Sequence, residues 1–137
     1  MDKNLQQAYL NSDYIIDDEL GFWQINIGDT DRTLSRYLHT FDVPTAAFIT
    51  AENPKSKRLS DKENKKRGQQ LLSQVQKLKL TCHQGYSIGA KADWPKENSL
   101  LITNITKQQA NSLAQQFNQN AYVWLDETGA VKLIELA

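Results

Sequence analysis

Two helix-start signals, each placed shortly after an apolar run, constrain the fold of this chain more than any other feature. One begins at Ser60 and the other at Thr106, and both are capping boxes whose side chains satisfy backbone N–H groups of the first helical turn. The preceding apolar runs, residues 45–51 and 99–103, suit β-strands. The order strand, helix, strand therefore occurs twice, which is typical of a domain that combines helices with one sheet.

The remaining hydrophobic pattern predicts further elements around this core. Strands are expected over residues 14–16, 22–27, 45–51, 81–88, 99–103, 121–126 and 131–136, and helices over 34–41, 60–79 and 106–117. At 137 residues the chain is long enough to bury a core without a disulfide or a metal. We therefore predict a single α/β (α+β) domain over residues 1–137, with a mixed β-sheet of six to seven strands and three main helices, packed mainly on one face.

Composition indicates the cellular location in which the protein is expected. No apolar run reaches the roughly 20 residues of a membrane helix, and the N-terminus lacks the apolar segment of a signal peptide. Cys82 is the only cysteine, so an internal disulfide is excluded. We expect a cytoplasmic protein that does not associate with membranes; its oligomeric state is not determined by the sequence.

Charge is unevenly distributed along the chain although the net charge is zero. Residues 1–31 carry seven acids and one lysine, a net charge of −6, whereas residues 55–96 carry eleven bases and three acids, a net charge of +8. Such an asymmetry predicts a pole that attracts an anionic small molecule or a nucleic acid, unless the two poles lie side by side and neutralise each other.

Connectivity predicts that polar residues gather at one rim of the sheet. If the strand at 45–51 points up, the strand at 81–88 also points up, while those at 99–103 and 121–126 point down. The end of the first strand and the starts of the last two then share the upper edge, where open α/β sheets commonly hold ligands. The candidate ligand-binding residues on this rim are Asn53, Lys55, Lys57, Arg58, Asn64, Trp94, Ser99, Gln119 and Asn120.

Each candidate on the rim has a structural alternative. The amide of Asn53 can donate and accept toward a ligand, or it can simply form a turn before Pro54. The basic residues of 55–58 beside a helix N-terminus suit a phosphate, but no glycine-rich phosphate loop is present and a solvated face is the alternative. Gln119 and Asn120 either contact a polar ligand or cap the preceding helix.

Glu97 is a weak candidate for acid–base catalysis. It lies between Trp94 and a strand, where partial burial would raise its pKa, and a salt bridge to the basic loop is the structural alternative. Ser99 shares its strand face, but no histidine is placed to activate it. Cys82 and His83 are adjacent and point to opposite faces, and no metal-ligand spacing is present. We expect no metal and no cofactor.

Several short motifs together resemble a known family. They are Phe48–Ser56, Leu59–Ser60, Glu63–Asn64, Trp94–Ser99, and Phe117–Ala121 with Trp124. Their order and spacing are similar to those of the bacterial family called domain of unknown function 3293. The resemblance implies a small bacterial domain without an assigned activity and supplies no mechanism. It also implies a bulky aromatic residue at the position of Glu52, where this chain departs from the pattern.

The sequence leaves three functional hypotheses open. The leading one is a non-enzymatic binding or regulatory domain whose polar and basic rim accepts an anionic or polar ligand, such as a nucleotide or nucleic acid. The first alternative is a small enzyme in which Glu97 acts as acid or base, oriented by Asn53, Gln119 and Asn120. The second alternative is a protein-interaction module that uses the acidic N-terminal hairpin.

Overall fold

The computed structural model describes residues 1–40, 42, 44–91 and 96–136. The helices are α1 (Lys3–Leu10), α2 (Arg32–Thr40), α3 (Asp61–Lys77) and α4 (Lys107–Gln116), with a short 3-10 helix η1 (Pro54–Ser56). The strands are β1 (Asp13–Asp18), β2 (Gly21–Ile25), β3 (Ala46–Thr50), β4 (Cys82–Ile88), β5 (Glu97–Thr103), β6 (Ala121–Leu125) and β7 (Val131–Glu135). The predicted α+β domain is confirmed, and α1 is an additional helix that the sequence pattern did not indicate.

All seven strands form one sheet in the order β2-β1-β4-β5-β3-β6-β7. The predicted strand directions hold, since β3 and β4 run the same way and β5 and β6 run the opposite way. The sheet differs from the predicted mixed one because β5 lies between β3 and β4, which makes every neighbouring pair of the described strands antiparallel. The segment from β3 to β6 has the split β-α-β, or ferredoxin-like, arrangement.

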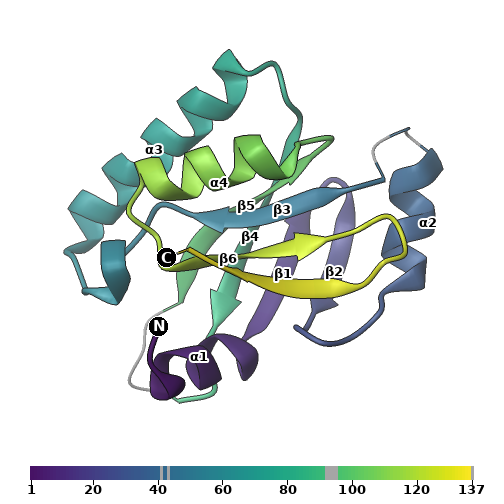
Figure 1. Ribbon diagram of the computed structural model, residues 1–137. Helices are drawn as coiled ribbons and strands as arrows, with labels where there is room; N and C mark the ends of the chain where they lie inside the picture. Colours follow the sequence, from purple (N-terminus) through teal and green to yellow (C-terminus); the bar gives the residue numbers. More distant parts are fainter. Residues whose placement is uncertain (41, 43, 92–95, 137) are drawn as a thin grey trace.

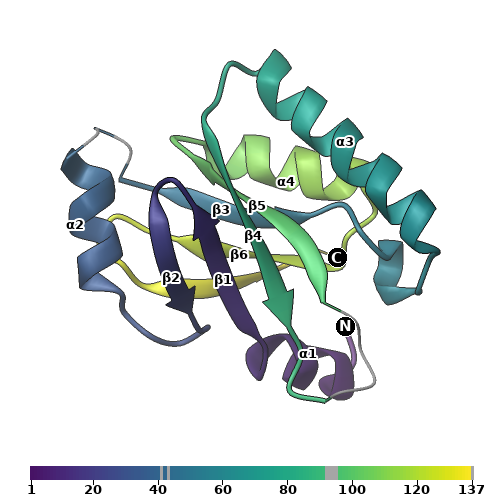
Figure 2. The ribbon, with the colours of Figure 1, turned by 180° about the vertical axis from the view of Figure 1, so that it is seen from behind.

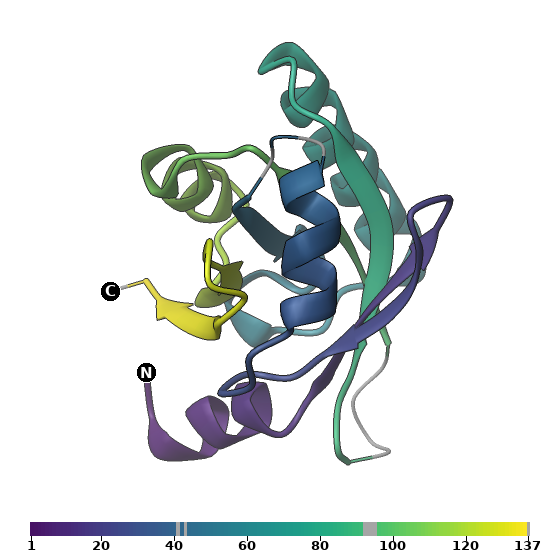
Figure 3. The ribbon, with the colours of Figure 1, turned by 90° about the vertical axis from the view of Figure 1, so that its right-hand side faces the viewer.

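The sheet curls around an apolar core that α2 covers. Leu34 and Leu38 of α2 are fully buried in this core, together with inward side chains of the strands such as Phe48 and Leu101. The two edges of the sheet meet at one corner, where the N–H of Gly28 donates to the carbonyl oxygen of Val131 (2.9 Å). Figure 3 shows α2 lying between the β1–β2 hairpin and the last strands.

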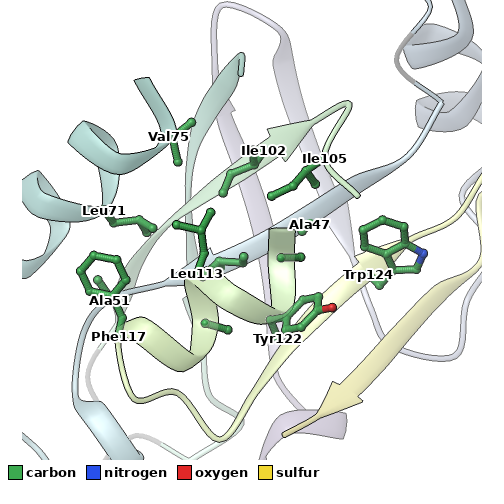
Figure 4. Close-up of a cluster of buried hydrophobic side chains, with 13 residues drawn as sticks. Ala47, Ala51, Leu71, Val75, Ile102, Ile105, Leu113, Phe117, Tyr122 and Trp124 are labelled. Atoms are coloured by element: carbon green, nitrogen blue, oxygen red, sulfur yellow. The ribbon is translucent and has the colours of Figure 1, made fainter. Parts of the chain in front are cut away.

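A second core lies on the opposite face of the sheet, beneath α3 and α4 (Figure 1). Leu71 and Val75 of α3 and Leu113 of α4 pack there against Ile102 of β5 and Trp124 of β6 (Figure 4). Because α2 lies on the other face, the expectation that the helices pack mainly on one face was wrong: the curled sheet has an inner face that also needs a cover.

Gly85 of β4 permits the close approach of neighbouring strands. A Cβ atom added there would lie 2.2 Å from the carbonyl oxygen of Ile15 and 2.9 Å from the ring of Phe48. Phe48 in turn makes an edge-to-face contact with Tyr14, with ring centroids 5.6 Å apart. On the inner face, this aromatic pair lies between the apolar side chains near α2 and the polar side chains at the other end. None of the helices in the described part of the chain has the length and apolar character needed to cross a membrane.

Candidate functional site

The inner face of the sheet changes from apolar to polar toward the end that lies away from α2. Along β5, Leu101 belongs to the inner core, and Ser99 and Glu97 follow on the same face. Their cross-strand neighbours are also polar, because Thr50 lies opposite Ser99 and Ser87 lies opposite Glu97. This end of the curled sheet is therefore lined by hydroxyl groups and one carboxylate.

Asn53 fixes the carboxylate of Glu97. Its backbone N–H donates to Oδ1 of Asn64 (2.9 Å), and its own Oδ1 accepts from Nδ2 of Asn64 and from the backbone N–H of Leu59 (2.9 Å each). Its Nδ2 then donates to Oε2 of Glu97 at 2.7 Å. Asn53 is 2% exposed and has a left-handed backbone with φ of 49°. The fold thus uses every polar group of this side chain to hold Glu97 in place.

Helix α1 brings Tyr9 to the same place. Nδ2 of Asn120 donates to Oγ of Ser56 (2.9 Å), and Ser56 lies near enough to the Tyr9 phenol to lower its pKa. The hydroxyl of Tyr14 donates to the carbonyl oxygen of Tyr9 (2.6 Å), which ties α1 to β1. Burial raises the pKa of Tyr9, the Ser56 side chain opposes this, and the negative charge of Glu97 raises that pKa further. Figures 1 and 2 both show α1 below the sheet, whereas α3 and α4 lie above it.

We call this group of residues the polar rim, of which Asn53 and Ser99 are themselves buried. It consists of Tyr9, Thr50, Asn53, Ser56, Ser87, Glu97, Ser99 and Asn120.

A basic loop, residues 55–58, adjoins the polar rim. The side chains of Lys55, Lys57 and Arg58 are exposed, and the loop leads directly to the N-terminus of α3. The backbone N–H of Lys55 donates to the carbonyl oxygen of Asn118 (2.7 Å), which holds the loop against the residues that precede β6. The polar rim therefore contributes the carboxylate of Glu97, and the basic loop beside it contributes the cations of Lys55, Lys57 and Arg58.

The structure divides the predicted site residues into two groups. Asn53, Glu97, Ser99 and Asn120 lie together on the polar rim, as the connectivity predicted, and Lys55, Lys57 and Arg58 lie beside them. Asn64 and Gln119 are buried behind the rim and support it. Trp94 lies outside the described residues.

The supporting role of Gln119 follows from its hydrogen bonds. Its Nε2 donates to the carbonyl oxygens of Glu52 (3.0 Å) and Phe117 (3.3 Å), and Phe117 is the residue that caps the C-terminus of α4. Gln119 therefore joins the end of β3 to the end of α4.

Ser99 is also buried, and its hydroxyl donates to the backbone carbonyl of Glu97 (3.3 Å).

Sequence reasoning missed Tyr9, Ser56 and Glu52. The side chain of Glu52 is buried on the other side of the β3 terminus; burial raises its pKa, and hydrogen bonds from Asn98 lower it. Ser56 and Glu52 are close in the sequence to Asn53, which was a candidate site residue, so the sequence around Asn53 could have indicated them. Nothing in the sequence pointed to Tyr9, because its position depends on how α1 docks.

Both histidines of the chain contact groups outside the polar rim. Nε2 of His39 is 3.0 Å from the carbonyl oxygen of Glu127, and Nδ1 of His83 is 3.1 Å from Oδ2 of Asp18. A serine nucleophile needs an adjacent base, whereas the hydroxyl of Ser99 donates to the backbone carbonyl of Glu97.

Asp18, Glu19 and His83 are grouped at the β1–β2 turn, with potential metal-ligand atoms within 4.8 Å of one another. Both carboxylate oxygens of Asp18 already accept backbone N–H groups, from Leu20 (2.8 Å) and Gln84 (3.0 Å). These bonds explain the cluster as a structural link between the hairpin and β4.

The fold and the rim define a small α+β domain of the split β-α-β class, with a polar surface at one end of a curled sheet. Residues 49–122, more than half of the chain, match the family model described as Protein of unknown function (DUF3293), so the chain belongs to this family. The matched segment includes Asn53, Glu97 and Asn120, whereas α1 and the β1–β2 hairpin precede it. No curated protein and no solved structure matches the chain.

Proposed function

We propose that this protein is a ligand-binding domain whose polar rim and basic loop together accept a small phosphorylated molecule that also carries hydroxyl or amino groups, such as a mononucleotide. The observation that carries the proposal is the carboxylate of Glu97, which Asn53 holds at 2.7 Å beside a loop of exposed cations. A carboxylate accepts hydrogen bonds from hydroxyl and amino groups, and cations attract phosphate.

The two halves of the site favour different parts of one ligand. On the inner side, Glu97 and the hydroxyls of Tyr9 and Ser56 suit neutral polar groups, since an anion would be repelled by the carboxylate. On the outer side, Lys57 and Arg58 precede the N-terminus of α3, where the helix dipole also favours negative charge. A ligand with a sugar at one end and a phosphate at the other matches this polarity.

The rigidity of the rim supports binding. Four hydrogen bonds fix Asn53, and three residues of this segment, Asn53, Lys55 and Ser56, have left-handed backbones. Groups that are already held in place lose little conformational freedom when a ligand arrives, so less of the interaction free energy is lost on binding.

Binding is favoured over catalysis by the surroundings of Ser99 and Glu97. Each histidine is hydrogen-bonded to a group other than Ser99 or Glu97, and the hydroxyl of Ser99 donates to a backbone carbonyl. An acid–base role for Glu97 remains the second candidate, because Tyr9 and Glu97 lie close enough for the charge of one to affect the pKa of the other.

Isothermal titration calorimetry of the full chain with mononucleotides, the matching nucleosides and inorganic phosphate tests the proposal. We expect the nucleotide to bind more tightly than either part, and binding to weaken at 300 mM compared with 50 mM salt. Glu97→Gln should lower the affinity for both nucleotide and nucleoside at least fivefold, whereas Glu127→Gln, at an exposed glutamate elsewhere, should have no effect.

A second pair of variants tests the basic loop. Lys57→Ala should lower nucleotide affinity at least threefold and leave nucleoside affinity unchanged, while Lys77→Ala, at an exposed lysine near the other end of α3, should leave both unchanged. The proposal is wrong if none of the mononucleotides binds, or if Glu97→Gln and Lys57→Ala bind as the unmodified protein does. Turnover of a bound nucleotide that Glu97→Gln abolishes would favour the enzyme.

A further inference from the structure

We infer that the β1–β2 hairpin is a second binding surface, independent of the polar rim, which accepts an extended basic segment of another protein as an additional strand beside β2. The two edges of the sheet differ in a way that supports this. The edge strand β7 has the sequence VKLIE, with a lysine and a glutamate, whereas the edge strand β2 has the sequence GFWQI, with no charged residue and no proline. Natural proteins usually protect edge strands with such residues, because exposed backbone groups otherwise pair with another chain.

The outer face of β2 exposes a large apolar side chain. Trp23 and Ile25 point inward, where Trp23 packs against Tyr37 of α2 with ring centroids 5.4 Å apart. Phe22 therefore points outward, and it is 63% exposed. An exposed phenylalanine on an unprotected edge is a typical anchor for a partner.

No helix of the described part of the chain crosses the outer face of this hairpin (Figures 2 and 3). On that face Phe22 lies opposite Asp17 and is followed on β2 by Gln24, which pairs with the buried Ile15. A strand added beside β2 would cover Phe22.

Charge determines the kind of partner. Asp17 is the direct cross-strand neighbour of Phe22, and both Asp17 and Glu19 are exposed. Residues 1–31 as a whole carry a net charge of −6. A second copy of the chain would bring two such acidic hairpins together, which is unfavourable. In a segment that alternates apolar residues with lysine or arginine, the cations can lie on the outer face, over Phe22 and toward Asp17, while the apolar residues continue the inner face of Trp23 and Ile25.

The experiment uses a short peptide of alternating valine and lysine as the probe, with the alternating valine and glutamate peptide as its control. Binding to the ¹⁵N-labelled full chain is followed by the amide signals of the protein. We expect the lysine peptide to shift the amide signals of residues 21–25 and the glutamate peptide to leave them unchanged.

Variants of the hairpin test which side chains hold the lysine peptide. Phe22→Ser should lower the affinity at least tenfold and Asp17→Asn at least threefold. Leu78→Ser, which removes an apolar side chain with 40% exposure on α3, should have no effect.

Four outcomes of the peptide titrations overturn the inference. They are absence of binding, equal binding of the two peptides, binding that Phe22→Ser does not weaken, and shifts confined to the polar rim. A dimer that forms with rising protein concentration and shifts the β2 amides without peptide also overturns it, because the edge then pairs with a second copy. Glu97→Gln should bind the lysine peptide normally, so failure here and failure of nucleotide binding are separate results.

Discussion

The two ends of the inner face of the sheet are built from the same strands and have opposite chemistry. At the α2 end, the inward side chains are apolar and Leu34 and Leu38 close the core completely. At the other end, Thr50, Glu97 and Ser99 occupy inward positions on β3 and β5. Burying polar groups costs free energy unless each is hydrogen-bonded, so a domain selected only for stability would gain from apolar residues at both ends. The difference agrees with the proposal that one end stabilises the fold and the other binds a ligand.

The ends also differ in the kind of interaction that orders them. The α2 end depends on burial of apolar surface, which has no preferred direction. The rim depends on directional hydrogen bonds that place Asn53 and Glu97 in one geometry. The following variants test whether this division of roles is real.

The largest effect is expected at the α2 end. Leu34→Ala creates a cavity in a fully buried position and should lower the free energy of unfolding by about 2–5 kcal/mol. The nucleotide affinity of the folded fraction should not change, because the substitution is remote from the rim. Denaturant unfolding and calorimetry measure the two quantities. A drop in affinity as large as that of Glu97→Gln would show that the two ends are coupled.

A smaller loss of stability together with a loss of nucleotide affinity is expected at the rim. Asn53→Ala removes the bonds to Leu59, Asn64 and Glu97, and should lower the free energy of unfolding by about 1–3 kcal/mol. Nucleotide affinity should fall at least tenfold, since Glu97 loses the group that holds it. Asn104→Ala is the matched control: Asn104 is exposed and also has a left-handed backbone, with φ of 59°, so it reports the backbone contribution alone.

The smallest effect is expected for Glu52→Gln, and it depends on pH. Burial raises the pKa of Glu52 in the folded state, so this group stabilises the fold most below the ordinary glutamate pKa of about 4.3, and that contribution is lost as pH rises through the raised pKa. Glutamine does not titrate, so the stability of the variant relative to the unmodified protein should increase across this window. Denaturant unfolding between pH 3 and pH 8 measures the difference. A difference that does not change with pH would place the carboxylate in a more solvated position than the structure does.

The sequence predicted much of the fold because the signals were local. The Thr106 capping box forms as expected, and at Ser60 the side chain caps α3 while its hydroxyl donates to the carboxylate of Glu63. The strands that flank these helices followed from short apolar runs, and their directions from connection lengths. Helix α1 was missed because it has only eight residues, and its Leu5, Ala8 and Tyr9 complete a single apolar repeat.

The candidate site was predictable in part for the same reason. Asn53, Glu97 and Asn120 come from three separate segments, yet the alternation of strands and helices was sufficient to place them on one rim. Tyr9 could not be predicted, because its contact with Ser56 depends on the docking of α1.

The sequence by itself determined the order of strands and helices from β3 to β6, the segments that meet at the rim and the unequal charge of the two halves. These depend on periodicity, caps and connection lengths, which act over a few residues. Only the tertiary structure decided that the sheet curls, that β5 lies between β3 and β4, and that α2 and α1 are placed at different ends. Those features depend on contacts between residues far apart in the chain, such as Gly28 with Val131 and Tyr9 with Ser56, and such contacts leave no periodic pattern in the sequence.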